Sequence, residues 1–293
     1  PYAQAAIVAC SSKTGAGLDD IRQAIQDACE GIEPARQKHA LRLPVDRVFT
    51  IKGAGTVITG TLWSGTAQSG DSVEVLPSGR MSRIRGVQEH DHPVDVAYPG
   101  NRVALNLADL STDEIRPGDF LASPGSLTTT DRFDALFTYM DTAKTGKPLA
   151  SGTRLHVAHG TREVIGRVLF ADDEKLIKSG QSISAQNRLD EQLAIASGDR
   201  FIVRSWSPVQ VIGGGRVLLA HPRRRTTLEP AERELLDAVV AGDIRTAAEK
   251  AAELFPFPFY AGEASQSLGL PEDTATKHLD GAVAKQRLIT LEA

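Results

Sequence analysis

Two arginines and one aspartate carry the sharpest chemistry in this sequence of 293 residues. Asp46 and Arg47 are adjacent, and Arg102 follows the turn dipeptide Pro99-Gly100. Guanidinium groups form charge-assisted hydrogen bonds with anions, so two of them facing one pocket would favour a negatively charged ligand. Judged from these residues alone, an exposed ion pair between Asp46 and Arg47, worth ~0 to 1 kcal/mol, explains the pattern better. Assigning an anion-binding pocket to these three residues therefore requires further evidence from the rest of the sequence.

The sequence contains no complete catalytic or nucleotide-binding motif. The phosphate-binding pattern G-x-x-x-x-G-K-[ST], the magnesium-linked Asp-x-x-Gly and the guanine-reading Asn-Lys-x-Asp are all absent. Gly53 and Gly55 lack the third glycine and the following helix of a dinucleotide site, so a turn explains them better. We assign no catalytic residue, and we expect the chain as given to be inactive as an enzyme.

The histidines do not indicate a metal site. His90, Asp91 and His92 fall in an expected loop without an evident third ligand, and a solvated loop is the better interpretation. His156 and His159 lie three positions apart on an expected strand, where side chains alternate between faces, so they should point in opposite directions. We therefore expect no bound metal.

Composition sets modest bounds on the class of protein. Hydrophobic residues make up 41% of the chain and the net charge is −4, as in ordinary globular proteins. The length suggests two to four compact units. No signal sequence and no run of ~20 apolar residues occurs, so we expect no membrane association. Cys10 and Cys29 have no CxxC spacing, which favours two reduced thiols in a cytoplasmic protein.

Residues 41–65 predict the opening of a small antiparallel barrel. Apolar residues alternate with polar ones on both sides of a glycine turn, which is typical of a strand pair. Further strands are expected within 70–77, 99–107 and 115–125, and regular turn dipeptides separate them. This first barrel should run over 41–124, with Trp63 packed in it.

A second barrel is predicted over 131–222. Several alternating apolar segments read as strands between turn residues, and Trp206 is expected to pack in the barrel. Basic residues outnumber acidic ones within 151–225, which would suit contact with RNA, although solvated surface charge explains the excess equally well. The run Arg223-Arg224-Arg225 ends this region.

Helical patterns occupy both ends of the chain. The apolar run 5–10 predicts a buried parallel strand, and apolar residues at helical spacing within 18–29 predict a helix after it. Residues 228–293 predict helices in a helix-turn-helix with the start of a wing at 288–293. Acidic residues outnumber basic ones in this C-terminal unit, so we favour a spacer over direct RNA contact.

The barrel segments resemble a known family. In order and spacing they are similar to the second domain of translational GTPases such as elongation factor Tu, and DRVFTIKGAGTV is closest to the selenocysteine-specific elongation factors (SelB). The resemblance covers Ile7 to about Pro222. It implies four units: the last strand and helix of a GTPase domain at 1–33, barrels at 41–124 and 131–222, and a winged-helix unit at 228–293. The fold class is thus mainly β, and most of the GTPase domain would be missing.

The resemblance also implies site residues. Ser11, Ser12 and Lys13 match the loop that contacts the guanine base in such GTPases; without the family, they read equally well as a turn whose serines cap the following helix. Elongation factor Tu relatives usually have an apolar residue in place of Arg47 and no arginine at the position of Arg102. In SelB-like factors the matching aspartate and two arginines are proposed to line the selenocysteine pocket.

A function follows from the resemblance as an expectation. The whole protein would bind selenocysteinyl-tRNA and deliver it to the ribosome for incorporation at recoded UGA codons, using GTP with magnesium. No cofactor is expected in the chain as given. Missing C-terminal domains would contact the mRNA hairpin, and the protein should be a cytoplasmic monomer.

Three other interpretations remain open at this stage. The barrels could belong to an elongation factor Tu-like protein, or to the GTPase subunit of a sulfate-activating enzyme, which uses such barrels without tRNA. Arg47, Arg102 and the helical appendage argue against the sulfate-activating subunit. A winged-helix DNA regulator is disfavoured by the acidic C-terminal unit.

Overall fold

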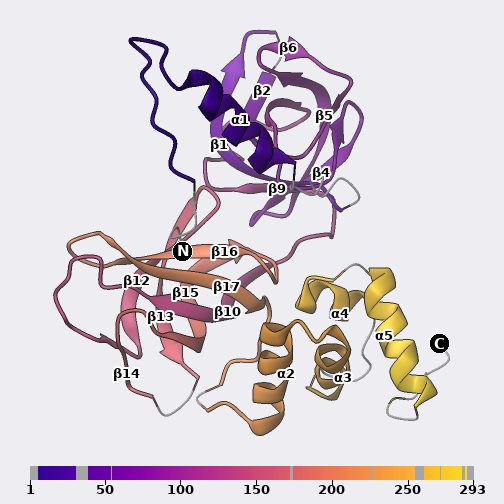
Figure 1. The fold of residues 1–293 in the computed structure, drawn as a ribbon. Helices are drawn as coiled ribbons and strands as arrows, with labels where there is room; N and C mark the ends of the chain where they lie inside the picture. Colours follow the sequence, from indigo (N-terminus) through magenta and orange to yellow (C-terminus); the bar gives the residue numbers. More distant parts are fainter. Residues whose placement is uncertain are drawn as a thin grey trace.

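The computed structural model describes residues 6–30, 39–53, 55–171, 174–225, 227–254, 261–270, 272–285 and 288. Two β-barrels follow one another along the chain, and the C-terminal helices lie beside the second barrel (Figure 1). The predicted fold class, mainly β with two antiparallel barrels followed by helices, is confirmed. Among the described residues, no helix is both long and apolar enough to cross a membrane.

The first barrel is a closed antiparallel ring in the order β4, β9, β1, β2, β8 and β5, and β5 pairs back to β4. The predicted strand pair around the glycine turn is present as β1 and β2, with Gly53 at φ 85° in the connection. The strands are β1 (Arg42–Ile51), β2 (Gly55–Thr61), β3 (Ala67–Gln68), β4 (Ser72–Leu76), β5 (Arg80–Glu89), β6 (His92–Pro93), β7 (Val96–Ala97), β8 (Arg102–Leu107) and β9 (Phe120–Ala122).

The second barrel closes in the order β10, β15, β13, β12, β16 and β17, again antiparallel throughout. Its inward positions are filled by a core that includes Phe133, Phe137 and Phe201. The strands are β10 (Thr129–Tyr139), β11 (Leu149–Ala150), β12 (Thr153–His159), β13 (Arg162–Phe170), β14 (Leu176–Ile177), β15 (Ser182–Ala194), β16 (Arg200–Ser205) and β17 (Val211–Leu219).

The two tryptophans have different environments. Trp63 is not part of the first barrel's core, contrary to the prediction: it is 37% exposed and packs edge-on against Phe120 and His159 between the barrels. Trp206 lies outside the barrel core and is 48% exposed, contrary to the prediction. Its ring stacks on His156 because strand alternation points His156 outward, while His159 is buried as expected from its position.

A buried charged cluster joins the two barrels. Arg42 on β1 donates two hydrogen bonds, of 3.1 and 2.6 Å, to the carboxylate of Asp199, which precedes β16. His159 Nε2 lies 3.3 Å from the same carboxylate and its ring stacks on Phe120. Burial alone would raise the pKa of Asp199, but the close contact with His159 and the hydrogen bonds from Arg42 outweigh it and lower the pKa. The barrels are therefore joined by a compensated charge cluster within an apolar contact.

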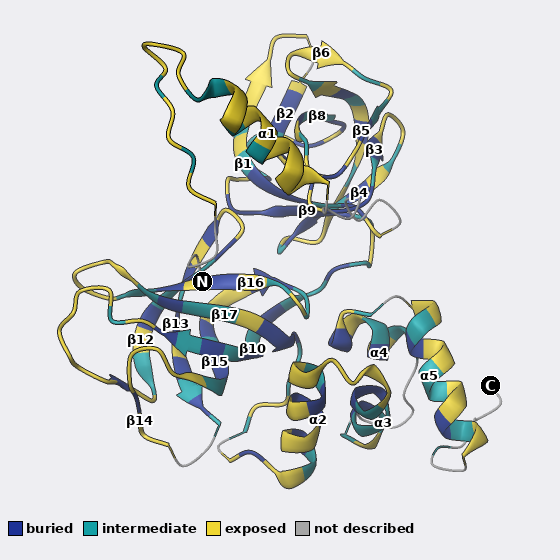
Figure 2. Ribbon diagram, in the orientation of Figure 1, coloured by how far each residue is buried: buried dark blue, intermediate teal, exposed yellow. Residues whose placement is uncertain are grey.

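The N-terminal segment confirms the predicted helix but not the predicted strand. Helix α1 (Leu18–Cys29) forms where apolar spacing indicated it, yet none of its residues is buried (Figure 2). The described residues 6–10 belong to no strand, and Ile7 is 98% exposed. A parallel strand needs neighbouring strands, and none of the described residues pairs with this segment.

In the described part of the chain, four helices follow the second barrel. Helix α2 begins with a capping box, in which Glu229 and Glu232 each accept a hydrogen bond from the other's backbone. The predicted wing at 288–293 lies outside the described residues, except for Leu288. The helices are α2 (Pro230–Ala241), α3 (Ile244–Leu254), α4 (Ala261–Leu268) and α5 (Glu272–Ala284).

The helices share a hydrophobic core with the second barrel. Leu218 and Leu219 of β17 are buried in one cluster with Leu235 and Leu236 of α2 and with residues of α3 and α4. At a second contact, Gly269 approaches the carbonyl of Ser197 so closely that a Cβ atom would lie 2.5 Å from its oxygen. The helical unit is thus packed directly on the barrel.

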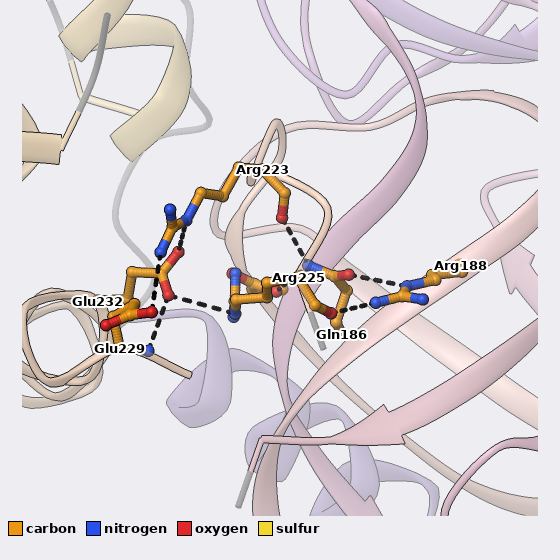
Figure 3. Close-up of polar contacts among 7 residues, drawn as sticks. Gln186, Arg188, Arg223, Arg225, Glu229 and Glu232 are labelled. Carbon is orange, nitrogen blue, oxygen red and sulfur yellow. Dashed lines mark hydrogen bonds and ion pairs between the residues drawn. The ribbon is translucent and has the colours of Figure 1, made fainter. Parts of the chain in front are cut away.

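A polar network accompanies this packing (Figure 3). Arg225 forms an ion pair of 2.8 Å with Asp134 of β10, and Arg223 forms one of 2.6 Å with Glu232 of α2. Gln186 donates a hydrogen bond of 3.1 Å to the carbonyl oxygen of Arg223. Two of the three consecutive arginines, Arg223 and Arg225, therefore hold the barrel–helix junction together.

Asp134 should make stability depend on pH. Burial raises its pKa to about 6, although Arg225 and Gln186 act in the opposite direction. An acid with a higher pKa in the folded chain binds its proton more tightly there, so this carboxyl disfavours folding increasingly as pH rises through 4 to 6. The unfolding free energy of Asp134→Asn minus that of wild type should therefore increase by about 2 to 3 kcal/mol when the pH is raised from 4 to 7.

Urea unfolding at both pH values measures this change. Asp131→Asn is the matched control, because the hydrogen bond from Arg132 lowers the pKa of Asp131 and reverses the sign. A pH-independent difference between wild type and Asp134→Asn would contradict the assignment.

Candidate functional site

A β-bulge places the adjacent residues Asp46 and Arg47 on the same face of the first barrel. Val45 pairs with Gly60 and Arg47 pairs with Thr59, so Asp46 is the extra residue of β1. Val45 is fully buried and Val48 packs against the same core, although residues three apart on a regular strand point to opposite faces. The bulge resolves this conflict by turning both intervening side chains outward.

Asp46 is held by the neighbouring strands. Thr59 on β2 donates a hydrogen bond of 2.5 Å to Asp46 Oδ1. Arg102 on β8 forms an ion pair with Asp46 through both terminal nitrogens, with Nη2 3.1 Å from Oδ1. The same Nη2 lies 3.3 Å from the Thr59 hydroxyl oxygen. Three adjacent strands therefore fix one carboxylate and one guanidinium, and Arg102 remains about half exposed.

Arg47 is left without a countercharge. Its side chain is exposed and forms no ion pair with any of the residues that the structure describes. The ordinary Asp46–Arg47 ion pair considered from the sequence is absent from the described contacts, because Asp46 pairs with Arg102 instead. Chemically, the site offers one fixed guanidinium and one free guanidinium on the same barrel face, an arrangement that suits an anionic group.

Sequence reasoning missed Thr59. It sits opposite Arg47 in the β1–β2 ladder and opposite Ala104 in the β2–β8 ladder, so it lies between the two arginine-bearing strands. Strand alternation could have placed it outward, since Ile58 and Gly60 on either side are buried. The pairing of Asp46 with Arg102 was not predictable, because it depends on which strands become neighbours.

The sequence contains no phosphate-binding motif that could act together with the loop of Ser11, Ser12 and Lys13. The hydroxyl oxygen of Ser11 accepts a hydrogen bond of 3.2 Å from the amide of Thr14, and its own amide donates to the carbonyl of Ala16. Helix α1 has Gly17 at its N-cap, so neither serine caps it. Ser12 and Lys13 could at most contact a base, and the residues present do not fit a whole GTP molecule.

We expect residues 1–293 to show no measurable GTP binding, because no backbone loop in this sequence can wrap a triphosphate. Isothermal titration calorimetry with GTP and magnesium measures this directly. GDP serves as a control for weak binding through the base alone. Micromolar affinity for GTP would contradict the expectation.

The remaining candidate residues have structural roles. His90 and Asp91 form the two-residue turn between β5 and β6, with φ values of 50° and 65°, as a tight hairpin requires. Among the described residues, no group of three or more potential metal ligands occurs.

Comparisons with known proteins match both barrels. Residues 55–122 match the family model for elongation factor Tu domain 2. Residues 138–224 match the model for the β-barrel domain of selenocysteine-specific elongation factor. The order of two such barrels defines the chain's class: it is the two-barrel region of a translation elongation factor.

Within that class the chain is SelB-like. It is 40% identical over 214 residues to the selenocysteine-specific elongation factor of Desulfomicrobium baculatum, which covers 73% of this chain and 33% of that protein. It is 31% identical over 230 residues to the one of Escherichia coli K12, covering 78% of this chain and 35% of that protein. The chain thus spans about a third of the length of these curated relatives.

A solved structure agrees with the sequence matches. The bacterial selenocysteine-specific elongation factor EF-Sec superposes with a TM-score of 0.71 at 26% identity. The superposition covers 88% of this chain and 40% of that structure. Its coverage of this chain is wider than that of the sequence matches above.

Proposed function

We propose that this chain is part of a GTP-dependent elongation factor that binds selenocysteinyl-tRNA and delivers it to the ribosome at recoded UGA codons. The observation that carries the proposal is the outward pair Arg47 and Arg102 on a barrel whose relatives are selenocysteine-specific factors. The GTPase activity would reside in parts of the protein other than the barrels, since this chain has no phosphate-binding motif.

The proposed selectivity rests on charge. A selenol is largely ionised at neutral pH, whereas the hydroxyl of serine is neutral. The free guanidinium of Arg47 would form charge-assisted hydrogen bonds with a selenolate and would stay poorly paired beside serine. Asp46 would hold Arg102 rather than Arg47 in position, since the ion pair joins Asp46 to Arg102. Arg47 is therefore the principal selectivity residue of this proposal.

The rest of the proposal concerns organisation. We propose a GTPase-domain remnant at 1–33, barrels at 41–124 and 131–222, and a winged-helix unit at 228–293. Further domains would contact the selenocysteine-insertion mRNA hairpin, and Ser11, Ser12 and Lys13 would lie in the guanine loop of the whole GTPase domain. The protein would act in the cytoplasm as a monomer.

The test is a comparison of dissociation constants. Selenocysteinyl-, seryl- and cysteinyl-tRNA carrying the same tRNA body should be titrated into the full-length protein with GTP bound. The proposal expects the tightest binding for selenocysteinyl-tRNA. Equal affinity for all three would remove the selenocysteine assignment but leave a general aminoacyl-tRNA carrier.

The match of 55–122 to elongation factor Tu domain 2 keeps a second candidate, a general elongation factor Tu-like carrier. The same titration separates the two, because a general carrier should bind all three aminoacyl-tRNAs alike. Absence of any tRNA binding would favour a sulfate-activating GTPase subunit instead.

A further inference from the structure

The dipeptide Asp-Arg occurs at a register shift in the first strand of each barrel, and the two copies pair differently. In β10, Asp131 lies at the shift, and its neighbour Arg132 donates hydrogen bonds of 2.7 and 3.1 Å to its carboxylate. In β1, Asp46 lies at the shift, but it pairs with Arg102 and not with its neighbour Arg47. Adjacent side chains of this dipeptide can therefore pair at such a shift, and a feature of the first barrel prevents it.

The residue opposite the arginine differs between the two strand pairs. Arg132 lies opposite Arg188 in the β10–β15 ladder, whereas Arg47 lies opposite Thr59 in the β1–β2 ladder. Arg188 has no acceptor and directs its own hydrogen bonds to Gln186 and to a backbone carbonyl. Thr59 instead donates a hydrogen bond of 2.5 Å to the carboxylate of the bulged aspartate. The first barrel thus has a hydroxyl group that holds this carboxylate.

The Thr59 hydroxyl also orients the carboxylate towards β8. Oδ1 of Asp46 accepts from Thr59 and from Nη2 of Arg102, which lies 3.1 Å away, and the same Nη2 is 3.3 Å from the hydroxyl oxygen. A hydroxyl donates one proton and accepts at its lone pairs, so it can contact both charged groups at once. A methyl group of the same size can do neither. With Oδ1 fixed in this way, Oδ2 meets Nη1 of Arg102.

We infer that Thr59 is a positioning residue of the candidate site, because its hydroxyl directs Asp46 to Arg102 and so keeps Arg47 unpaired. Without the hydroxyl, Asp46 would pair with Arg47, as the corresponding pair does in β10. The free cation would then be neutralised before any anion arrives. The inference deepens the proposed function and rests on it for the identity of the anion, a selenolate. The choice of partner by Asp46 does not depend on any ligand.

The first experiment therefore tests the pairing in the 293-residue chain without RNA. An ion-paired guanidinium rotates slowly about its Nε–Cζ bond and gives resolved Nη signals in NMR spectra, whereas a free guanidinium gives averaged signals. Wild type and Thr59→Ser should show slow rotation for Arg102 and averaging for Arg47. Thr59→Val should reverse this pattern. Slow rotation confined to Arg102 in Thr59→Val would overturn the inference, whatever the protein binds.

The second experiment measures selectivity in the full-length protein with GTP bound. Thr59→Val should lower the preference for selenocysteinyl- over seryl-tRNA by about tenfold, as expected for losing a hydrogen bond to a charged group, and Thr59→Ser should retain the preference. Thr61→Val is the matched control, because Thr61 is exposed on the same face of β2 and makes none of these contacts among the described residues.

A double-mutant cycle distinguishes positioning from direct contact. If Thr59 acts by keeping Arg47 free, Thr59→Val should cause no further loss of preference in the Arg47→Gln protein. Additive losses would make Thr59 a direct contact of the aminoacyl group and overturn the positioning role. Equal losses for both tRNAs in Thr59→Val would reduce the residue to a structural one. A wild-type protein without any preference would remove the selenocysteine assignment, while the NMR spectra would still decide which arginine Asp46 pairs with.

Discussion

Replacing Arg47 with glutamine should lower the preference for selenocysteinyl- over seryl-tRNA by about tenfold or more in the full-length factor. A hydrogen bond to a charged partner contributes ~1.5 to 3 kcal/mol, and ~1.4 kcal/mol corresponds to a factor of ten in affinity. Arg47 has no carboxylate partner among the described residues, so no internal ion pair offsets the loss. Affinity for seryl-tRNA should stay constant or rise slightly. Paired dissociation constants with GTP bound measure the effect.

Arg102→Gln should also lower the preference, but it removes the ion pair with Asp46 at the same time. Asp46→Asn separates the two effects, because it loosens Arg102 and keeps both guanidiniums. Arg85→Gln on the same barrel is the control for general charge. Equal losses for both tRNAs at Arg47 and Arg102 would make these residues general tRNA contacts and remove the pocket assignment.

Asp199→Asn should destabilise the contact between the barrels by about 3 to 5 kcal/mol, because it leaves the largely buried guanidinium of Arg42 without its countercharge. Arg42 and Asp199 side chains are 14% and 9% exposed, so water cannot replace the lost charge. Urea unfolding of the 293-residue chain at neutral pH measures the change. Asp190→Asn is the matched control, since its ion pair with Arg154 is about half exposed and should contribute ~0 to 1 kcal/mol.

Asp199 should also make the stability of the folded chain depend on pH, with the opposite sign to the dependence caused by Asp134. The pKa of Asp199 is lowered in the folded chain, so its contribution to stability is present above its ordinary pKa and is lost as the pH falls through the folded value. Acidification should therefore weaken the junction between the barrels. A loss of stability in acid that is identical in wild type and Asp199→Asn would contradict this.

The sequence predicted the barrels well because their signals are local. Alternating apolar residues and turn glycines define β1 and β2 without reference to any distant part of the chain. The helices after residue 228 were predicted from apolar spacing for the same reason. Local patterns failed at residues 6–10, where an apolar run predicted a strand that only neighbouring strands could have stabilised.

The candidate site was predictable as a set of residues but not as a geometry. Asp46, Arg47 and Arg102 were selected from their types and the family resemblance. The bulge that turns Asp46 and Arg47 to one face involves a register shift that no local pattern announces. Likewise, the sequence shows Arg223, Arg224 and Arg225 only as consecutive charges, whereas in the structure Arg223 and Arg225 pair with the buried carboxylates of Glu232 and Asp134.

The leucines at the end of β17 have a consequence for how such proteins can be rearranged during evolution. Leu218 and Leu219 close the barrel and also form one wall of the helical core. A recombination event that separated the two parts would leave leucines facing water on one product and an open core on the other. The second barrel and its helices should therefore be inherited together, and a new C-terminal module would be added most readily beyond the helices rather than in their place.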